Sequence, residues 1–370
     1  MVVSINVLVC SSLSVMRLNV CKGHDWLTVY SVIASDSPGL AFDQTPEWFA
    51  LYVDYILEAS SEVVMLVVVD EATKQPFFAM PATLRKSGQA VVRQLNSLSN
   101  YYTSLFQPVF SAQGQSEASA VSCFVSFLGN NDVAWDEFSL QPLAEDSPFF
   151  NHLLCSLDQQ GYRYSLSPCF TNWFLPLDGC CYADYEQALP SKLRNTIRRK
   201  QRKLAREHQV RICIIEGESD LEAYIRDYER VYQNSWKGEE SHPDFIRALI
   251  RAFAKAGWLR LGLLYVDDVA VAAQLWFVKS AVASIYKLSY DDDYAKYSVG
   301  TILTAAMMKQ VIDVERVEVV DFLTGDDAYK KDWMSHQQQR YRLRIYNKGT
   351  MRGQVLAFWN EKFKKILGRS

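Results

Sequence analysis

The chain has 370 residues, more than one ordinary domain usually holds, so two domains are expected. Apolar residues make up 49% of the chain and charged residues 22%, the composition of a soluble globular protein with sizeable cores. The net charge of −3 argues against a surface adapted as a whole to nucleic acid, and only a local basic patch could serve that purpose.

The eight cysteines show no CxxC spacing, so neither a zinc site nor a redox motif is predicted, and we expect no metal. Reduced thiols fit a cytoplasmic location. The N-terminus has no basic residue before Arg17 and makes a poor signal peptide. Translation could start at Met1 or at Met16, and in the second case the first fifteen residues would be a disordered tail. The apolar run Val63–Val69 is too short to span a bilayer, so no membrane insertion is expected.

The N-terminal half shows a mixed pattern of helix and strand periodicity. It predicts a helix at 46–57, strands at 63–69, 76–84 and 89–96, a helix at 117–128, a strand at 137–140, a helix at 149–160 and a strand at 164–177. Tyr101, Tyr102 and Phe106 form an aromatic cluster that either lines a substrate cleft or packs between the halves.

A basic helix follows a join at 182–190. Pro190 and Ser191 begin it, with Ser191 as the expected N-cap, and eight Lys or Arg residues lie between Lys192 and Arg206. This face could bind the phosphates of a cofactor, an acidic saccharide or tRNA. Alternatively, it is a solvated face, and the aliphatic parts of its Lys and Arg side chains cover the sheet.

The second half predicts a strand at 210–215, helices at 220–233 and 243–256, and strands at 259–266, 269–278 and 281–290. A polar loop then reaches Gly300 and an amphipathic helix, followed by a strand at 317–323, a short helix at 328–333, a strand at 341–346 and a helix at 351–366. Gly300 lies at a helix start, where unpaired N–H groups and the positive end of the helix dipole favour phosphate. A glycine that only tightens the turn is the alternative.

Three segments carry a resemblance to a known family: VDFLTGDDAYKKDW (320–333), YSVGTILT (297–304) and LPSKLRNTIRRKQRKL (189–204). They resemble the GNAT acyltransferase superfamily, and within it the branch of CelD-like and Fem-type transferases. The resemblance implies an α/β (α+β) fold with a mixed sheet and two GNAT-like domains in tandem, the first degenerate because it lacks the glycine loop. We expect a poorly defined segment at 1–36 and domains at 37–185 and 186–370.

The resemblance also implies acetyl-CoA or another acyl-CoA as co-substrate, held in a wedge between the central strands. Ser298, Val299, Gly300 and Thr301 match the family's phosphate loop, although Tyr297, Val299 and Thr301 depart from its fuller glycine pattern. In the acceptor site we expect four residues to bind substrate: Gln274, Trp276, Lys330 and Trp333.

Asp321 ends a strand among apolar neighbours that should raise its pKa, so we expect it to bind substrate or accept a proton. A helix cap or an ion pair with Lys330 is its alternative role. Tyr329 is the candidate acid for the leaving thiolate, unless it is a packed tyrosine. His242 and His336 have no paired carboxylate in the sequence pattern and are interpreted as structural or surface residues.

Three functions remain open. The first is an acyl-CoA-dependent N- or O-acyltransferase that transfers an acetyl group to a small-molecule amine or a saccharide. The resemblance to the CelD-like branch implies a role in exopolysaccharide or envelope biosynthesis. The second is a Fem-like transferase that uses aminoacyl-tRNA, although nucleic acid is otherwise not expected. The third is a non-catalytic scaffold with the GNAT fold. The sequence leaves the oligomeric state undetermined.

Overall fold

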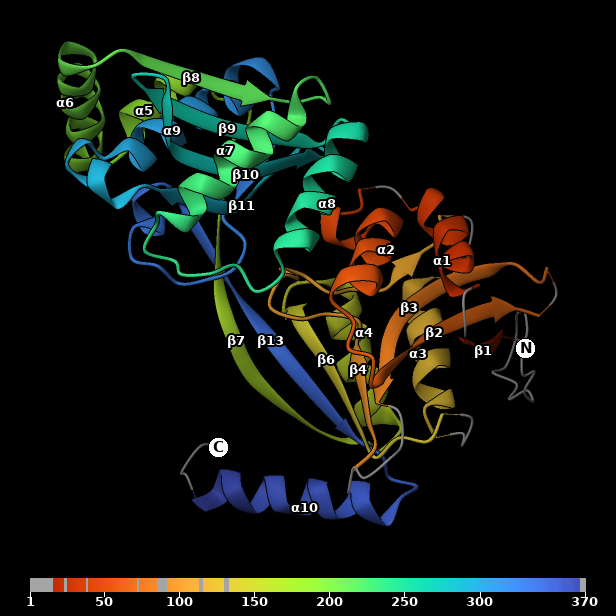
Figure 1. Ribbon diagram of the computed structural model, residues 1–370. Coiled ribbons are helices and arrows are strands. Elements are labelled where there is room, and N and C mark those ends of the chain that lie inside the picture. The colour runs from red at the N-terminus through yellow and green to blue at the C-terminus, as the bar shows by residue number, and fades with distance from the viewer. Residues whose placement is uncertain are drawn as a thin grey trace. The chain divides into compact units, whose positions relative to one another are not determined.

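The computed structural model describes residues 16–22, 25–37, 39–71, 73–85, 92–112, 116–129 and 133–366. The chain divides into two compact units (Figure 1). Unit 1 comprises residues 1–170 and 338–370, and unit 2 comprises residues 171–337. Within the described residues, the helices are too short or too polar for one to cross a membrane.

Unit 1 contains a mixed sheet with the strand order β1-β2-β3-β4-β6-β13. Its strands are β1 (Met16–Lys22), β2 (Ser61–Asp70), β3 (Pro76–Arg85), β4 (Gln94–Ser97), β5 (Val109–Phe110), β6 (Glu137–Ala144), the first part of β7 (Arg163–Pro176) and most of β13 (His336–Tyr346). Its helices are α1 (Trp26–Ser35), α2 (Pro46–Tyr55), α3 (Glu117–Phe127), α4 (Pro148–Gln159) and α10 (Met351–Ile366), with the 3-10 helix η1 (Phe42–Gln44). β6 pairs with β4 in parallel and with β13 in antiparallel orientation.

Unit 2 continues from the last residues of β7 in the strand order β7-β12-β11-β10-β9-β8. Its strands are β8 (Val210–Ile215), β9 (Leu259–Val266), β10 (Val269–Lys279), β11 (Val282–Tyr290) and β12 (Val319–Asp321). Its helices are α5 (Tyr182–Ala188), α6 (Ser191–Glu207), α7 (Leu221–Gln233), α8 (Pro243–Lys255) and α9 (Val299–Lys309), with short helical turns η2 (Asp292–Tyr297), η3 (Gln310–Val314) and η4 (Lys330–Asp332).

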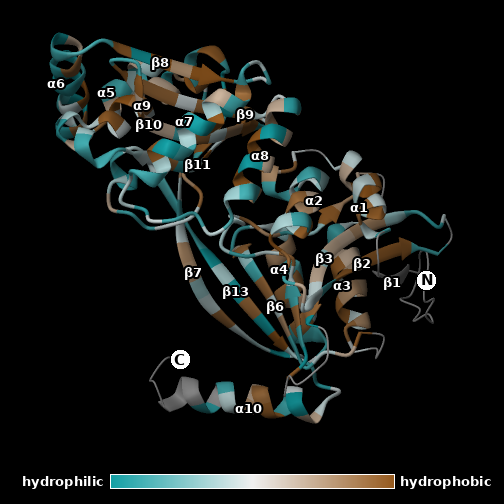
Figure 2. Cartoon of the chain, viewed as in Figure 1, coloured by the Kyte–Doolittle hydropathy of each residue, from teal (hydrophilic) through white to brown (hydrophobic). Residues whose placement is uncertain are grey.

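The core of unit 2 explains why these segments form helices and strands. The apolar side chains of α9, among them Ile302, Leu303 and Met307, pack with Trp276 and Ile285 of the sheet. On α8, Phe253 packs edge-on against Phe277 of β10. Figure 2 shows the contrast with α6, which is largely hydrophilic. Only Ile197 and Leu204 of α6 are buried, so this helix attaches to unit 2 along one narrow stripe.

Several predicted elements differ from the observed ones. The segment 1–36 was expected to be poorly defined, but β1 and α1 lie within it, and α1 buries Tyr30 against Phe49. The expected join at 182–190 contains α5. Pro190, not Ser191, is the N-cap of α6, and the Ser191 side chain makes no cap bond. The possible tail at residues 1–15 lies outside the described residues.

The two units also differ in extent from the expected domains at 37–185 and 186–370. β13 pairs with β6 along residues 340–346, so the end of the chain groups with unit 1. The start of unit 2 at Thr171 falls within β7. Tyr102 and Phe106 are buried within unit 1, whereas Tyr101 is 82% exposed. Tyr101 therefore faces solvent, while its ring packs edge-on against the buried Tyr102 with ring centroids 5.6 Å apart.

Candidate active site

The two central strands of unit 2 separate after a short parallel pairing. β11 and β12 pair from Val282 with Val319 to Ser284 with Asp321. β11 then continues to Tyr290, while the chain after Asp321 turns through Leu323 (φ 53°). In the described part of the chain, no strand pairs with β11 on this side beyond Ser284. The two strands thus diverge after Ser284 and Asp321, and we call the gap between them the wedge. The backbone of β11 from 285 to 290 is its open edge.

A β-bulge lies at the start of this open edge. Leu275 of β10 is opposite Lys287 and Trp276 is opposite Ile285, so Tyr286 is an extra residue on β11. A bulge bends its strand and increases the local twist. It therefore accounts physically for the separation of β11 from β12.

The start of α9 lies at the end of the same strand. Ser298 has a left-handed backbone (φ 55°) and is the N-cap, and the first helical bond runs from the Ile302 N–H to the Ser298 carbonyl at 3.1 Å. Among the described residues, no group accepts a hydrogen bond from the N–H groups of Val299, Gly300 or Thr301. Three donors and the positive end of the helix dipole are thus available for an anion.

Gly300 packs closely against an aromatic ring. A Cβ placed on Gly300 would lie 2.9 Å from Cδ1 of Tyr290. The Tyr290 ring in turn packs against Trp236, with ring centroids 4.5 Å apart, and Trp236 is 50% exposed. The absence of a side chain at Gly300 therefore makes room for Tyr290.

Gln274 and Trp276 were expected to bind substrate, and both are fully buried. The Gln274 amide donates to the Gly300 carbonyl at 3.0 Å and to Thr304 Oγ1 at 2.7 Å. The Trp276 indole N–H donates to Gln274 Oε1 at 2.9 Å. These side chains hold the first turn of α9 on β10, which is a positioning role. Their contact with an acceptor stays a prediction.

A hydrogen-bonded chain next to the α9 start was not predicted. His208 Nδ1 lies 2.7 Å from Asp267 Oδ2, and His208 Nε2 lies 3.1 Å from the Tyr297 hydroxyl oxygen. The Tyr297 hydroxyl donates to Glu207 Oε2 at 2.9 Å. Hydrogen bonds from Arg206 and Tyr297 lower the pKa of Glu207, so this carboxylate is ionised and accepts.

The directions of these hydrogen bonds follow from the donors and acceptors available. Tyr297 has one hydroxyl hydrogen, which goes to Glu207, so its oxygen can only accept from His208. Asp267, whose pKa is lowered first by its hydrogen bond with His208, also accepts. Both ring nitrogens of His208 thus take part in these hydrogen bonds. Tyr297 directly precedes Ser298, so this chain positions the turn that opens α9.

The basic face of α6 lies close to the same turn. The Lys200 ammonium donates to the Lys296 carbonyl, and Lys203 lies 5.0 Å from the centroid of the Tyr297 ring. A hollow on α6 is lined by Lys192, Asn195, Thr196, Arg198, Arg199, Arg202, Lys203 and Arg206. Of these, Arg198 pairs with Glu186 at 3.3 Å. The helix thus presents a row of cations on the side opposite its buried stripe.

Asp321 ends β12 at the mouth of the wedge. Its Oδ1 accepts from the Asn172 amide at 2.5 Å and from the Leu323 N–H at 2.6 Å. Asn172 is 2% exposed and also donates to the Leu323 carbonyl at 3.1 Å. Asn172 therefore orients the carboxylate, and sequence reasoning missed it because β7 lies 149 residues earlier in the chain. The expected rise in the pKa of Asp321 stays a prediction.

Lys330, expected at the acceptor site, is 3% exposed and turned into its own loop. Its ammonium donates to the carbonyls of Phe322 (3.2 Å), Thr324 (2.5 Å) and Gly325 (3.2 Å). Burial lowers the pKa of Lys330, and the charge of Asp327, 3.9 Å away, opposes this effect. Lys330 therefore shapes the loop that leaves the wedge.

Tyr329 directly precedes Lys330 in the sequence, and Trp333 follows it by three residues. Tyr329 is 41% exposed, and its ring packs edge-on against Phe322 at 5.8 Å. Burial of the hydroxyl, followed by the charge of Asp327, raises the pKa of Tyr329, so the phenol stays protonated and can donate. Trp333 is 5% exposed, and its carbonyl accepts from the Tyr185 hydroxyl at 3.0 Å.

The remaining sequence-based candidates do not join this site. His336 lies against Phe174, with ring centroids 5.4 Å apart, and His242 is the N-cap of α8. Within the described residues, the His, Cys, Asp and Glu side chains form no group of three that could hold a metal ion. Among the described residues, Cys155, Cys169, Cys180, Cys181 and Cys213 have free thiols.

Comparisons with known proteins show similarity in sequence over part of unit 2 and in fold over most of the chain. Residues 191–331 match the family described as acetyltransferase (GNAT) domain. The chain resembles the crystal structure of FemX with a TM-score of 0.61 and 9% identity, over 91% of this chain and 99% of that one. The comparison with curated proteins finds no match.

Two further structures are similar. One is the C-terminal DUF2156 domain of a putative lysylphosphatidylglycerol synthetase from Agrobacterium fabrum, with a TM-score of 0.52, 13% identity and coverage of 92% of this chain and 96% of that one. The other is a conserved protein of unknown function from Bacteroides thetaiotaomicron, with a TM-score of 0.52, 12% identity and coverage of 86% and 97%. The predicted fold class, a mixed α/β architecture, is confirmed.

Proposed function

We propose that unit 2 is the catalytic part of an acyl-CoA-dependent acyltransferase. The observation that carries this proposal is the open wedge between β11 and β12 next to three available N–H donors at the start of α9. The donors of Val299, Gly300 and Thr301 suit a pyrophosphate, and the open edge of β11 suits an extended chain with amide groups. Acetyl-CoA or another acyl-CoA supplies the activated acyl group as co-substrate.

The side chains at the wedge supply the proton transfers. Asp321 accepts the proton of an attacking amine or hydroxyl in this proposal, which its orientation by Asn172 and the Leu323 N–H supports. Tyr329 donates a proton to the departing thiolate in this proposal, which its raised pKa supports because the phenol stays protonated. Lys330 contributes by fixing the conformation of its own loop. The side-chain hydrogen bonds that link Asp267, His208, Tyr297 and Glu207 keep the turn before α9 in place.

The acceptor we propose is a small-molecule amine or a saccharide. The resemblance of the segments at 189–204, 297–304 and 320–333 to CelD-like proteins favours an acceptor in exopolysaccharide or envelope assembly. The free thiols are compatible with the reducing cytoplasm, where we place the reaction.

A Fem-like transferase that uses aminoacyl-tRNA is the second candidate. Two observations favour it, the likeness to FemX and the row of cations on α6. A phosphodiester backbone is recognised largely by such cations, and its binding weakens steeply with salt.

Ligand-dependent thermal unfolding separates these candidates. Acetyl-CoA, longer acyl-CoA thioesters and tRNA are added to the full chain in separate series. We expect an acyl-CoA to stabilise the protein by ~2.7 kcal/mol at a hundredfold excess over its Kd. Stabilisation by tRNA alone would favour the second candidate. A folded protein that responds to none of these ligands would favour the scaffold.

A further inference from the structure

The last helix of unit 1 exposes a row of large apolar side chains. Met351 is 84% exposed, Val355 51%, Phe358 47% and Trp359 54%. The spacings of four, seven and eight residues place all four on one face of α10. Soluble proteins seldom leave such a row in water without a binding role.

The opposite face of α10 is fixed to unit 1. Gly353 and Ala357 are buried, and a Cβ on Gly353 would lie 2.2 Å from the carbonyl oxygen of Asn347. No residue larger than glycine fits there without a shift of the backbone. Because Gly353 must face inward, the rotation of α10 about its axis is set and the apolar row faces outward.

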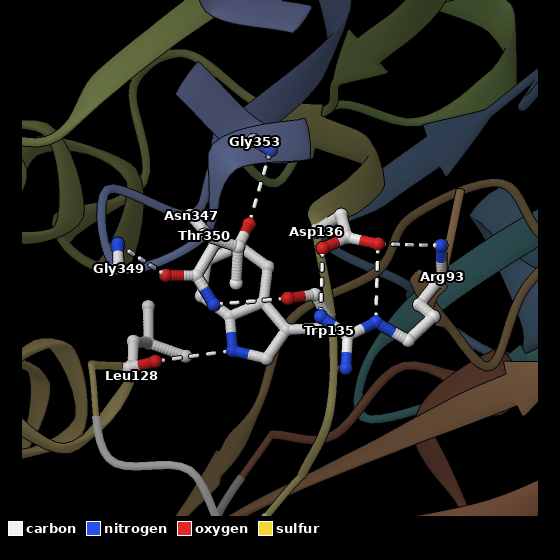
Figure 3. Close-up of polar contacts among 8 residues, drawn as sticks. All are labelled: Arg93, Leu128, Trp135, Asp136, Asn347, Gly349, Thr350 and Gly353. Carbon is white, nitrogen blue, oxygen red and sulfur yellow. Dashed lines mark hydrogen bonds and ion pairs between the residues drawn. The ribbon is translucent and has the colours of Figure 1, made fainter. Parts of the chain in front are cut away.

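A network of hydrogen bonds anchors the start of α10 (Figure 3). The Gly353 N–H donates to Thr350 Oγ1 at 3.0 Å, and the Asn347 amide donates to the Trp135 carbonyl at 2.9 Å. The Asn347 N–H donates to the Asp136 carbonyl at 3.0 Å, and the Asp136 carboxylate pairs with Arg93 at 2.8 Å. These hydrogen bonds therefore fix the start of α10, and with it the direction of its exposed face, relative to unit 1.

Positive charge accompanies the apolar row. Arg352 and Lys362 are exposed on α10, and the Lys362 ammonium lies 4.7 Å from the centroid of the Phe358 ring. The sequence from 351 to 370 contains five basic residues and one acidic residue, in a chain whose net charge is −3. Apolar and cationic side chains thus share one surface.

This combination selects one kind of partner. A second copy of the chain would bring the same cations against these, which repel. The surface of a bilayer with anionic lipids accepts both features, because aromatic and aliphatic side chains enter the boundary below the headgroups while Lys and Arg meet the phosphates. We infer that α10 is a membrane-surface helix that docks the protein on anionic bilayers, lying in the interface without crossing it.

The test uses the full chain and vesicles in a flotation assay. Vesicles of phosphatidylcholine alone are compared with vesicles that also contain phosphatidylglycerol, at low and high salt. We expect binding to the anionic vesicles that weakens with salt. Phe358→Glu and Trp359→Glu should each weaken binding by about tenfold, as expected when an apolar anchor in the interface becomes an anion.

Tyr101→Glu is the matched control, because Tyr101 is an exposed aromatic residue of unit 1 outside α10. It should leave vesicle binding unchanged. Circular dichroism and thermal unfolding confirm that each variant is folded. The inference fails if the folded wild-type chain floats with neither kind of vesicle, or if the α10 variants bind as well as Tyr101→Glu. A dimer in sedimentation that Trp359→Glu dissociates, without vesicle binding, would assign the face to a second copy instead.

Discussion

The contact between Gly300 and Tyr290 allows a quantitative test of the α9 turn. In Gly300→Ala the new Cβ would lie 2.9 Å from Tyr290 Cδ1, so the ring must move by several tenths of an ångström. Overpacking of this kind costs about 1–3 kcal/mol. Alanine recovers up to about 1 kcal/mol of helix propensity relative to glycine. We therefore expect Gly300→Ala to lower the free energy of unfolding by about 0–3 kcal/mol.

The second substitution, Tyr290→Ala, removes the neighbour that causes the clash. In that background Gly300→Ala should be neutral or stabilising by up to about 1 kcal/mol, which gives a coupling energy of about 1–3 kcal/mol between the two positions. Chemical denaturation of the wild type, both single variants and the double variant measures this coupling. Equal destabilisation by Gly300→Ala in both backgrounds would refute the argument.

Coenzyme A binding by the same four proteins shows whether Gly300 is needed for packing against Tyr290 or for direct contact with the phosphate. The Cβ of residue 300 points at Tyr290, and alanine keeps the N–H group of residue 300, so the double variant should bind coenzyme A as tightly as Tyr290→Ala does. Calorimetric titration gives the affinity. If the double variant is stable but loses coenzyme A, Gly300 is needed for close approach of the phosphate itself, as the sequence pattern first suggested.

Three further predictions concern charged groups. Asp321→Asn keeps an acceptor oxygen for Asn172 but removes the base, so turnover with an identified acceptor should fall about 10²–10⁴-fold while calorimetry shows nearly unchanged coenzyme A affinity. His208→Gln cannot keep both bonds of His208, so the turn that opens α9 should loosen and calorimetry should show weaker coenzyme A binding. The hydrogen bond from Arg93 lowers the pKa of Asp136 from 3.8 to about 2, so its stabilisation, on the order of 2 kcal/mol, is present above pH ~4 and lost as the pH falls towards 2. Acid unfolding of Asp136→Asn should lack this loss, and an unchanged acid profile would contradict it.

The strand and helix order of unit 2 could be predicted because its periodicities are strong and local. The predicted strand at 210–215 and the strands near 259–266, 269–278 and 281–290 match β8 to β11 closely. By contrast, α1 has the sequence WLTVYSVIAS, whose β-branched residues do not favour a helix. The packing of Tyr30 on Phe49 overrides this local preference.

The candidate site could be predicted in its backbone but less well in its side chains. Gly300 and Asp321 were found because each ends or begins an element. Asn172 was missed because its partner Asp321 is 149 residues away. His208 was missed because its partners Asp267 and Tyr297 are 59 and 89 residues away, and no local sequence pattern marks such pairs. Lys330 has the sequence signature of an exposed charge, yet three carbonyls of its own loop allow its burial.

The pairing of β13 with β6 has a consequence for synthesis on the ribosome. When residue 170 has been made, β6 has β4 on one side, but its other neighbour is still absent, because residues 338–346 follow the whole of unit 2. At about 5–20 residues per second, translation of that insert takes about 8–33 s, during which the nascent sheet carries an open edge. Unit 2, contiguous in sequence, can complete its folding within this interval. The open edge is where unwanted strand pairing would begin, so slow translation or truncation before β13 should favour aggregation of unit 1.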